Sequence, residues 1–349
     1  MLTFFVPPIH RVPTGGNVFN RRVMEALSNK DAMKGVVSVV EGFPGEVAPR
    51  PVDSGGNSVA LVDSLVARTA GRSTVLKARR LFPKLIMIVH YLNLLNPDRR
   101  GSRDVQRERE ILKDYDGFIT TSRYSREALI AHGVTPALVR VVRPGLNGIF
   151  RSRPRIDSRS RPVRILTVSN LLAGKGLVGF LRVLEETGDL SWEWDIVGTD
   201  SLDAAYARRF RRRLDESSVL SRVRLNGSLS GRKLVDIYDR SDLFVLPSRF
   251  ESCSLVLMEA MARGLPVMAF EVGGIPETVQ GSGGARLIPP GNWRRFGDAV
   301  RKLVEDASER AAMGTEGRET SRTFPSWDTT GREFRKKVLE LKRYRPDGG

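Results

Sequence analysis

The sequence predicts an α/β protein with two parallel-sheet domains, and three observations support this fold class. Short apolar runs alternate with helical patterns along the chain, which is typical of parallel strands joined by crossover helices. A polar segment rich in proline and arginine, residues 151–162, interrupts the alternation, which then resumes. The length of 349 residues suits two domains of ordinary size.

The first domain is expected over residues 1–150. Apolar runs predict its buried strands, and apolar residues at the helical period predict its helices. The predicted strands are Leu2–Val6, Val36–Val40, Val59–Val62, Leu85–Val89, Gly117–Thr120 and Val139–Val142. The predicted helices are Asn17–Ser28, Asp104–Lys113 and Ser125–His132.

The second domain is expected over residues 163–323, after a linker at 151–162. Its predicted strands are Val163–Val168, Trp194–Val197, Val223–Leu225, Leu243–Leu246, Pro266–Phe270 and Arg286–Ile288. Its predicted helices are Leu177–Glu186, Asp203–Ser217, Gly231–Arg240 and Ser254–Arg263. After Gly291 the pattern is helical to near the end, except around Phe324–Pro325, so residues 324–349 are expected to form a terminal helix.

The chain is strongly basic, with 57 lysine and arginine residues against 40 acidic residues and a net charge of +17. Basic residues cluster at 151–161 and 208–213. Each cluster is either a solvated face or a surface that attracts an anionic membrane or an anionic acceptor. No signature of a nucleic-acid-binding module is present, so we do not expect a nucleic-acid partner.

Cysteine content and apolar runs indicate a cytoplasmic protein, either soluble or peripheral on the inner face of the membrane. The single cysteine, Cys253, excludes an internal disulfide, and we interpret it as a packed residue rather than a reactive thiol. No apolar run approaches the ~18–20 residues of a membrane span. The first residues, M-L-T-F-F-V-P-P, are typical of a strand and not of a signal peptide.

Two carboxylates eight positions apart, Glu251 and Glu259, are the most informative feature of the chain. Glu251 follows a predicted strand and therefore lies at the carboxyl edge of a sheet, where open α/β folds bind ligands. Glu259 lies about one and a half turns into the next helix. The N-terminus of that helix offers free N–H groups to an anion. Together these features suit a nucleotide-linked sugar.

This spacing resembles the E-x7-E motif of retaining glycosyltransferases with the GT-B fold, specifically glycosyltransferase family 4. The likeness continues, in the family's order, through P-T-G-G at 13–16, H-G-V…V-V-R-P-G-L-N over 132–147, G-K-G at 174–176, V-G-T-D at 197–200, S-D-L-F-V-L-P-S-R-F-E-S at 241–252 and G-G-I-P-E at 273–277. The resemblance implies two Rossmann-like domains facing a central cleft. It assigns the acceptor to the first domain and the nucleotide sugar to the second, and it lets the last helix cross back to the first.

The resemblance also implies which residues bind the donor. Lys175 would neutralise the leaving nucleoside diphosphate, Glu251 would accept hydrogen bonds from the donor sugar, and Glu259 would bind the ribose hydroxyls. The remaining positions of the implied donor set are Gly15, Gly16, Asn170, Ser252, Cys253, Ser254, Leu255 and Glu277.

Two positions depart from the family pattern. Asn170 stands where an arginine is usual, which halves the side-chain charge at the leaving group, and Arg249 is a candidate to compensate. Ser254 stands where many members have glycine, and its hydroxyl suits a helix N-cap.

His90 is the third catalytic candidate, beside Lys175 and Glu251, because it ends a predicted strand and the family places a residue there near the reacting carbon. Gly15 and Gly16 are expected in the loop before the first helix, where glycine lets a ligand approach the backbone. His10 and His132 receive no comparable role.

The family implies no metal and no cofactor, because Lys175 and helix N-termini neutralise the diphosphate. The closest acidic pair, Asp114 and Asp116, is interpreted as a solvated boundary rather than a Mg²⁺ site. The favoured family mechanism is front-face attack, in which a donor phosphate oxygen takes the acceptor proton.

Three alternatives stay open: a nucleotide-sugar epimerase or phosphorylase on the same scaffold, a non-catalytic binding protein with this fold, and a basic nucleic-acid binder, which the ordered motifs disfavour. The sequence does not identify the base, the sugar or the acceptor, which is either lipid-linked or a saccharide.

Overall fold

The computed structural model of the chain describes residues 2–8, 14–28, 37–42, 58–70, 72–151 and 162–344. His10 lies outside the described residues, and so do almost all of the expected linker at 151–162 and of the basic cluster at 151–161. The chain forms two compact units, Met1–Gly145 with Pro325–Gly349 (unit 1) and Leu146–Phe324 (unit 2).

Unit 1 contains a six-stranded parallel sheet in the order β2-β1-β3-β4-β5-β6. Its strands are β1 Leu2–Val6, β2 Val37–Glu41, β3 Val59–Asp63, β4 Lys84–Val89, β5 Gly117–Thr120 and β6 Val139–Val141. Its α-helices are α1 Gly15–Ser28, α2 Ser64–Thr69, α3 Arg72–Leu81, α4 Arg103–Leu112, α5 Arg123–Ala131 and α13 Trp327–Arg343. The strand order reverses between β1 and β3, which makes their carboxyl ends the ligand-binding edge expected of such sheets.

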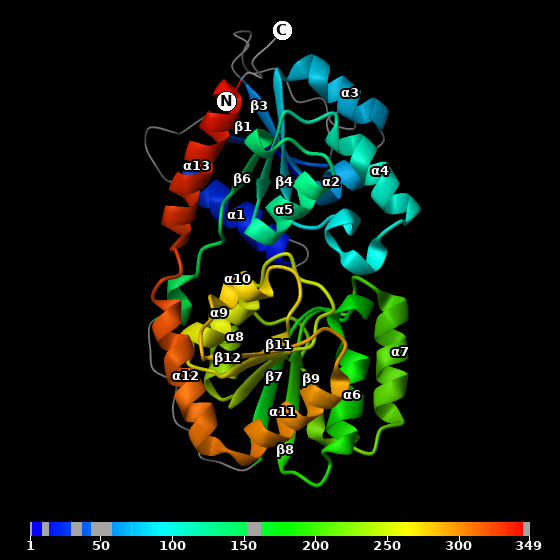
Figure 1. Cartoon of the computed structure of the whole chain (residues 1–349), viewed down its shortest axis with the longest axis vertical. Helices are drawn as coiled ribbons and strands as arrows, with labels where there is room; N and C mark the ends of the chain where they lie inside the picture. The colour runs from blue at the N-terminus through cyan, green and yellow to red at the C-terminus, as the bar shows by residue number, and fades with distance from the viewer. Residues whose placement is uncertain are drawn as a thin grey trace. The chain divides into compact units, whose positions relative to one another are not determined.

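The last helix, α13, packs against α1 in unit 1 (Figure 1). Phe334 of α13 contacts Phe4 and Phe19, with ring centroids 6.0 and 6.2 Å apart. Gly331 lies so close to α1 that a Cβ there would stand 2.5 Å from the Ala26 methyl carbon. Helix α13 therefore completes the core of unit 1.

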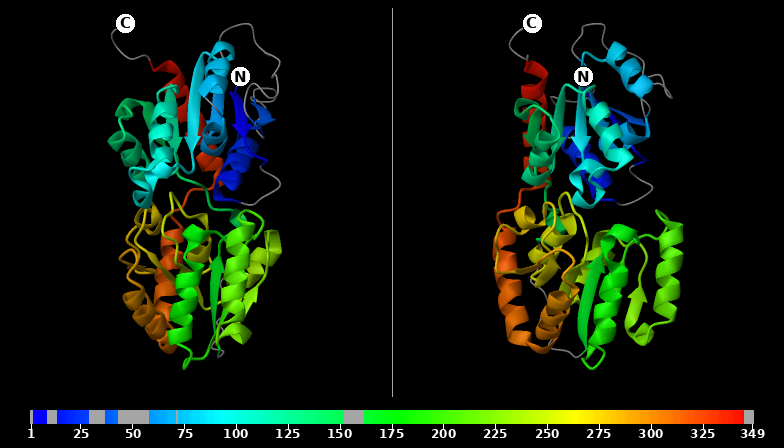
Figure 2. Two further views of the ribbon diagram at one scale, coloured as in Figure 1. Left: turned by 90° about the vertical axis from the view of Figure 1, so that its right-hand side faces the viewer. Right: turned by 45° about the vertical axis from the view of Figure 1, so that its right-hand side comes forward.

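Unit 2 contains a second six-stranded parallel sheet, in the order β12-β11-β10-β7-β8-β9. Its strands are β7 Val163–Val168, β8 Trp192–Val197, β9 Val223–Leu225, β10 Leu243–Leu246, β11 Val267–Phe270 and β12 Ala285–Ile288. Its α-helices are α6 Leu177–Glu186, α7 Ala204–Asp215, α8 Gly231–Asp239, α9 Leu255–Ala262, α10 Ile275–Val279, α11 Trp293–Glu305 and α12 Ala307–Ser321. Helices flank the sheet, with α11 beside α6 and α12 beside α9 (Figures 1 and 2).

The fold class predicted from the sequence, two Rossmann-like parallel-sheet domains, is confirmed. The division between the units falls after Gly145 rather than after residue 150. The reason is that Leu146 and Phe150 are buried in the core of unit 2. No helix in the described part of the chain is long and apolar enough to cross a membrane.

Candidate functional site

The first group of candidate residues lies where the strand order of unit 2 reverses, between β7 and β10. Ligands bind at such a switch point, outside the carboxyl ends of the strands. The loop after β7 carries Asn170 and Lys175, and the loop after β10 carries Glu251. A backbone hydrogen bond of 2.9 Å, from Arg249 N–H to the Gly174 carbonyl, ties the two loops together.

Lys175 and Glu251 meet at this edge. Lys175 Nζ donates to Glu251 Oε1 over 2.6 Å, and the two side chains are 24% and 13% exposed. Gly176 permits this approach, because its φ is +71° and a Cβ there would stand 1.9 Å from the Pro247 carbonyl oxygen. The structure therefore brings together, in one half-buried pair, a cation suited to phosphate and a carboxylate suited to hydroxyl groups.

The loop before α10 supports Glu251 from the other side. Gly274 N–H donates to the Glu251 carbonyl over 2.8 Å. Gly273 has a φ of +55°, and a Cβ there would stand 1.9 Å from the same carbonyl oxygen. Glu277 lies directly after this loop, in the first turn of the short helix α10.

Cys253 is a packed residue in this loop. Its Sγ lies 3.8 Å from Thr278 Oγ1. Burial raises the pKa of the thiol to about 12, so the group stays protonated at neutral pH. A thiol in that form is a poor nucleophile, which agrees with the packed role rather than the reactive one.

Ser254 does not cap α9 as its side chain was expected to do. It occupies the N-cap position but makes no side-chain cap hydrogen bond. Its hydroxyl, like those of Ser169 and Ser248 in the same two loops, is buried and has no hydrogen-bond partner among the described residues. Orphan hydroxyls are rare in proteins, and three at one sheet edge leave polar groups there for a ligand or ordered water to satisfy.

Glu259 lies in the second turn of α9, which begins at Leu255. The Tyr238 hydroxyl donates to Glu259 Oε2 over 2.9 Å. Burial raises the pKa of Glu259 to about 7, and the hydrogen bond from Tyr238 opposes that rise. The carboxyl group is thus balanced between its neutral and ionised forms near neutral pH.

Asn170 has a structural contact in the place where an arginine was expected. Its amide oxygen accepts a 3.0 Å hydrogen bond from the Thr199 backbone N–H. Asn170 thereby joins the loop after β7 to the loop after β8. Arg249, the residue expected to compensate in charge, has an exposed side chain.

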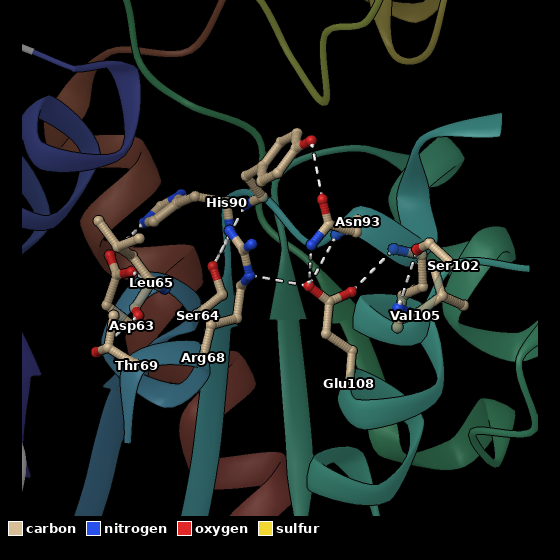
Figure 3. A network of polar contacts seen from close by, with 12 residues as sticks. Asp63, Ser64, Leu65, Arg68, Thr69, His90, Asn93, Ser102, Val105 and Glu108 are labelled. Atoms are coloured by element: carbon tan, nitrogen blue, oxygen red, sulfur yellow. Dashed lines mark hydrogen bonds and ion pairs between the residues drawn. The ribbon is translucent and has the colours of Figure 1, made fainter. Parts of the chain in front are cut away.

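The second group of candidates lies in unit 1, around His90 at the end of β4 (Figure 3). His90 Nε2 lies 2.9 Å from Asn20 Oδ1 and 3.6 Å from Asp63 Oδ2. The Asn20 amide nitrogen donates to Asp63 Oδ2 over 2.5 Å, so its oxygen faces His90 Nε2, which carries the proton. Burial lowers the pKa of His90, so the ring is neutral at neutral pH.

Gly15 and Gly16 form the first turn of α1 rather than a loop before it. A Cβ on Gly16 would stand 3.0 Å from the His90 ring, so a larger residue would press on the imidazole. A Cβ built on Gly15 meets no atom of the described residues within 4 Å. The two glycines therefore differ. Gly16 leaves space for the His90 ring, whereas at Gly15 the described residues leave space for a side chain.

Comparison with known proteins relates unit 2 to one enzyme group. Residues 149–320 match the family described as "Glycosyl transferases group 1". Over this region the chain is similar to the group 1 glycosyl transferases. The matched region contains Asn170, Lys175, Glu251, Glu259 and every other candidate in unit 2.

Two curated relatives illustrate the similarity. The amylovoran biosynthesis glycosyltransferase AmsK of Erwinia amylovora is 31% identical over 201 residues, which cover 55% of this chain and 48% of that protein. The D-inositol 3-phosphate glycosyltransferase of Corynebacterium jeikeium is 30% identical over 251 residues, which cover 67% of this chain and 59% of that protein. The chain thus spans about half to three fifths of the length of these relatives.

Solved structures show the same GT-B fold over nearly the whole chain. The sucrose-phosphate synthase of Thermosynechococcus elongatus has a TM-score of 0.77 at 20% identity, covering 97% of this chain and 98% of that one. Anabaena HepE in complex with UDP-glucose has a TM-score of 0.76 at 17% identity, covering 97% and 99%. At these identities the likeness establishes the fold alone.

Sequence reasoning missed a buried network next to His90, drawn in Figure 3. Glu108 of α4 accepts from the backbone N–H groups of Asn93 and Leu94, each over 2.9 Å, and from Arg68 Nε over 2.9 Å. It therefore fixes the loop that follows His90. The sequence signal that could have identified Glu108 is its position three residues after the apolar Val105, which places it on the buried face of the helix.

The interpretation of Asp114 and Asp116 as a solvated boundary was wrong. Asp114 is buried and pairs with Arg72 Nε over 3.1 Å. Asp116 pairs with Arg79 and accepts from the Leu85 N–H. Asp114 therefore holds α3, and Asp116 holds both α3 and β4. Among the described residues, no group of three or more histidine, cysteine or acidic side chains is arranged to hold a metal ion.

Proposed function

We propose that this chain is a retaining glycosyltransferase that moves a sugar from a nucleotide-diphosphate sugar to an acceptor hydroxyl. Unit 2 binds the donor and unit 1 binds the acceptor, which is either lipid-linked or a saccharide. The observation that carries the proposal is the Lys175–Glu251 pair at the switch point of unit 2, beside the start of α9. The similarity of the chain to HepE, whose structures contain UDP and UDP-glucose, favours a uridine nucleotide as the first donor to test.

In this proposal the donor reorganises the Lys175–Glu251 pair. The diphosphate replaces Glu251 as the partner of Lys175, and the released carboxylate accepts hydrogen bonds from the sugar hydroxyls. The amides of Ser252, Cys253, Ser254 and Leu255 face the phosphates at the start of α9. Stabilisation of the negative charge on the departing diphosphate is then the main catalytic contribution.

The reaction exchanges one bond at the anomeric carbon. The acceptor oxygen attacks on the face from which the diphosphate leaves, and the bond from the anomeric carbon to the phosphate oxygen breaks. The acceptor proton passes to an oxygen of the leaving diphosphate, so the sugar keeps its configuration. Lys175 and the α9 amides supply the positive charge for this step, and we propose that it needs no metal or cofactor.

Unit 1 contributes His90 to the acceptor side. The ring is neutral, its Nε2 proton is held by Asn20, and Nδ1 is the nitrogen left without a proton. We assign His90 a contact with the acceptor or with the donor sugar.

A ligand screen tests the proposal directly. UDP-, GDP- and ADP-glucose are each added to the protein, and the unfolding temperature is measured. A ligand that binds only the folded chain adds about 2.7 kcal/mol of stability at a concentration of 100 Kd. We expect one of the three to raise the unfolding temperature. No rise with any nucleotide sugar, or with the free diphosphates, would contradict the proposal.

Product analysis then separates transfer from its rivals. An epimerase would convert the donor without an acceptor, and a phosphorylase would require inorganic phosphate. A non-catalytic binding protein is a second candidate, favoured by the contact of Asn170 with Thr199 in place of an arginine at the leaving group. Slow hydrolysis of the donor in the absence of acceptor would count against that candidate.

A further inference from the structure

A tyrosine that the proposed reaction does not use lies inside unit 2, against Glu259. Tyr238 lies in the last turn of α8 and its side chain is fully buried. Its hydroxyl is 2.9 Å from Glu259 Oε2 and 3.4 Å from the Val256 carbonyl oxygen. Because the phenol has a single proton and the carboxylate is the nearer and stronger acceptor, it donates to Glu259.

Aromatic contacts fix the direction of this hydroxyl. The Tyr238 ring stacks on Phe244 of β10, with centroids 5.7 Å apart and planes 18° from parallel. Phe150 meets it edge-on, at 5.6 Å and 85°. A ring held on its face and its edge by buried neighbours cannot turn its hydroxyl away from α9.

The other charged groups near α9 lie next to residues other than Glu259. Arg263, at the end of α9, pairs with Asp239 of α8. Glu277 of α10 lies near Cys253, and Arg318 of α12 approaches Gly264. Lys175 pairs with Glu251. Among the described groups, the Tyr238 hydroxyl is the one that shifts the pKa of Glu259 appreciably. It lowers this pKa, whereas burial raises it.

We propose that Tyr238 is a positioning residue, whose hydroxyl donates to Glu259 and keeps that carboxyl group ionised as a hydrogen-bond acceptor for the ribose of the donor nucleotide. This rests on the proposed function, in which Glu259 binds ribose hydroxyls. The ionised carboxylate is a stronger hydrogen-bond acceptor than the neutral carboxylic acid, so protonation of Glu259 weakens binding of the donor. Donor affinity therefore falls as the pH drops through about 7, where burial places the pKa of Glu259.

The test measures affinity for the nucleotide sugar that binds in the screen, at pH values from about 5.5 to 9, for the wild type and Tyr238→Phe. A nucleotide sugar is the right probe, because a terminal phosphate would itself titrate near pH 6. The variant keeps the ring and its packing but loses the hydroxyl. We expect its affinity profile to shift to higher pH by about one unit, with an affinity at pH 7 lowered about fivefold and converging with the wild type near pH 9.

Two variants serve as controls. Tyr115→Phe removes another buried tyrosine hydroxyl, one without a hydrogen-bond partner in the described part of unit 1, and should leave the profile unchanged. Glu259→Gln removes the titrating group and should give a flat profile. The phenol of Tyr238 stays neutral throughout, because burial raises its pKa well above 10. A uniform loss of affinity at every pH in Tyr238→Phe would show a packing role only and would overturn the inference.

A measurement without nucleotide separates this inference from the proposed function. The Glu259 carboxyl is titrated by carbon-13 NMR in the wild type and in Tyr238→Phe. A midpoint near 7 that rises in the variant supports the Tyr238 contact, and a midpoint that the variant leaves unchanged overturns it. A rise in the NMR midpoint together with no binding of any nucleotide sugar would overturn the ribose role and the proposed function, while leaving the contact itself established.

Discussion

Lys175 is the residue whose side chain is assigned the largest catalytic contribution. Replacing it with alanine removes the cation from the leaving diphosphate, and we expect turnover to fall on the order of 10²–10³-fold. Its partner Glu251 stays half-buried at a sheet edge, so the fold should persist. Initial rates of sugar transfer and the unfolding temperature are the two measurements. Lys233→Ala, which removes an exposed lysine on α8, is the matched control, and activity near the wild type in Lys175→Ala would refute the role.

Glu259 gives a prediction about stability against pH. Its pKa is raised to about 7 in the folded chain, from an ordinary value of 4.5. The folded state then holds a proton that the unfolded chain releases between pH 4.5 and 7, so Glu259 lowers stability as the pH rises through that window. The free energy of unfolding of Glu259→Gln, relative to that of the wild type, should therefore be higher at pH 8 than at pH 5, by at most about 3 kcal/mol. Denaturant unfolding at the two pH values measures this gain, and a difference that is the same at both would contradict the raised pKa.

At the scale of elements, the donor site depends on how closely the loops after β7 and β10 approach each other. Gly176 has positive φ and no room for a Cβ beside the Pro247 carbonyl, whereas a Cβ on Gly174 meets no atom within 4 Å in the described part of the chain. Gly176→Ala should therefore lower the free energy of unfolding by more than about 1–3 kcal/mol and reduce nucleotide affinity. Gly174→Ala should change neither quantity. Unfolding and binding measurements on the two variants give the comparison. Equal effects of the two substitutions would show that the close approach of these two loops does not determine the geometry of the donor site.

Most elements, and the place of the donor residues, could be predicted from the sequence. Parallel strands bury both faces and read as continuous apolar runs, so β7 and β10 and the loops that follow them were found. The contacts of Tyr238 and Glu108 could not be predicted in this way. Each arises from the packing of one helix against another element, and the helical pattern shows which face is buried but not what it touches. Helices α2, α3 and α10 were not among the predicted helices. For α2 and α10 the reason is their length, because so few residues carry no periodic pattern.

For the whole molecule, net charge is the property that the fold does not explain. The chain carries +17, and arginines of α7 such as Arg208 and Arg212 are exposed. Others in that helix have acidic partners, as Arg213 does in Glu185. We predict that the protein floats with vesicles containing anionic lipid at low salt, and is released as salt screens the attraction within about a Debye length. Neutral vesicles are the control, and no binding to anionic vesicles at moderate salt would argue against a membrane role.

The proposed function requires unit 2 to bind the two parts of its donor, the diphosphate and the sugar, through different residues. Calorimetric binding of the free nucleoside diphosphate and of the matching nucleotide sugar, to the wild type, Lys175→Ala and Glu251→Gln, tests this most directly. We predict that Lys175→Ala weakens both ligands alike, because both carry the diphosphate. Glu251→Gln should weaken only the nucleotide sugar, because only that ligand presents sugar hydroxyls. Equal losses for both ligands in Glu251→Gln, or unchanged binding in Lys175→Ala, would contradict the account.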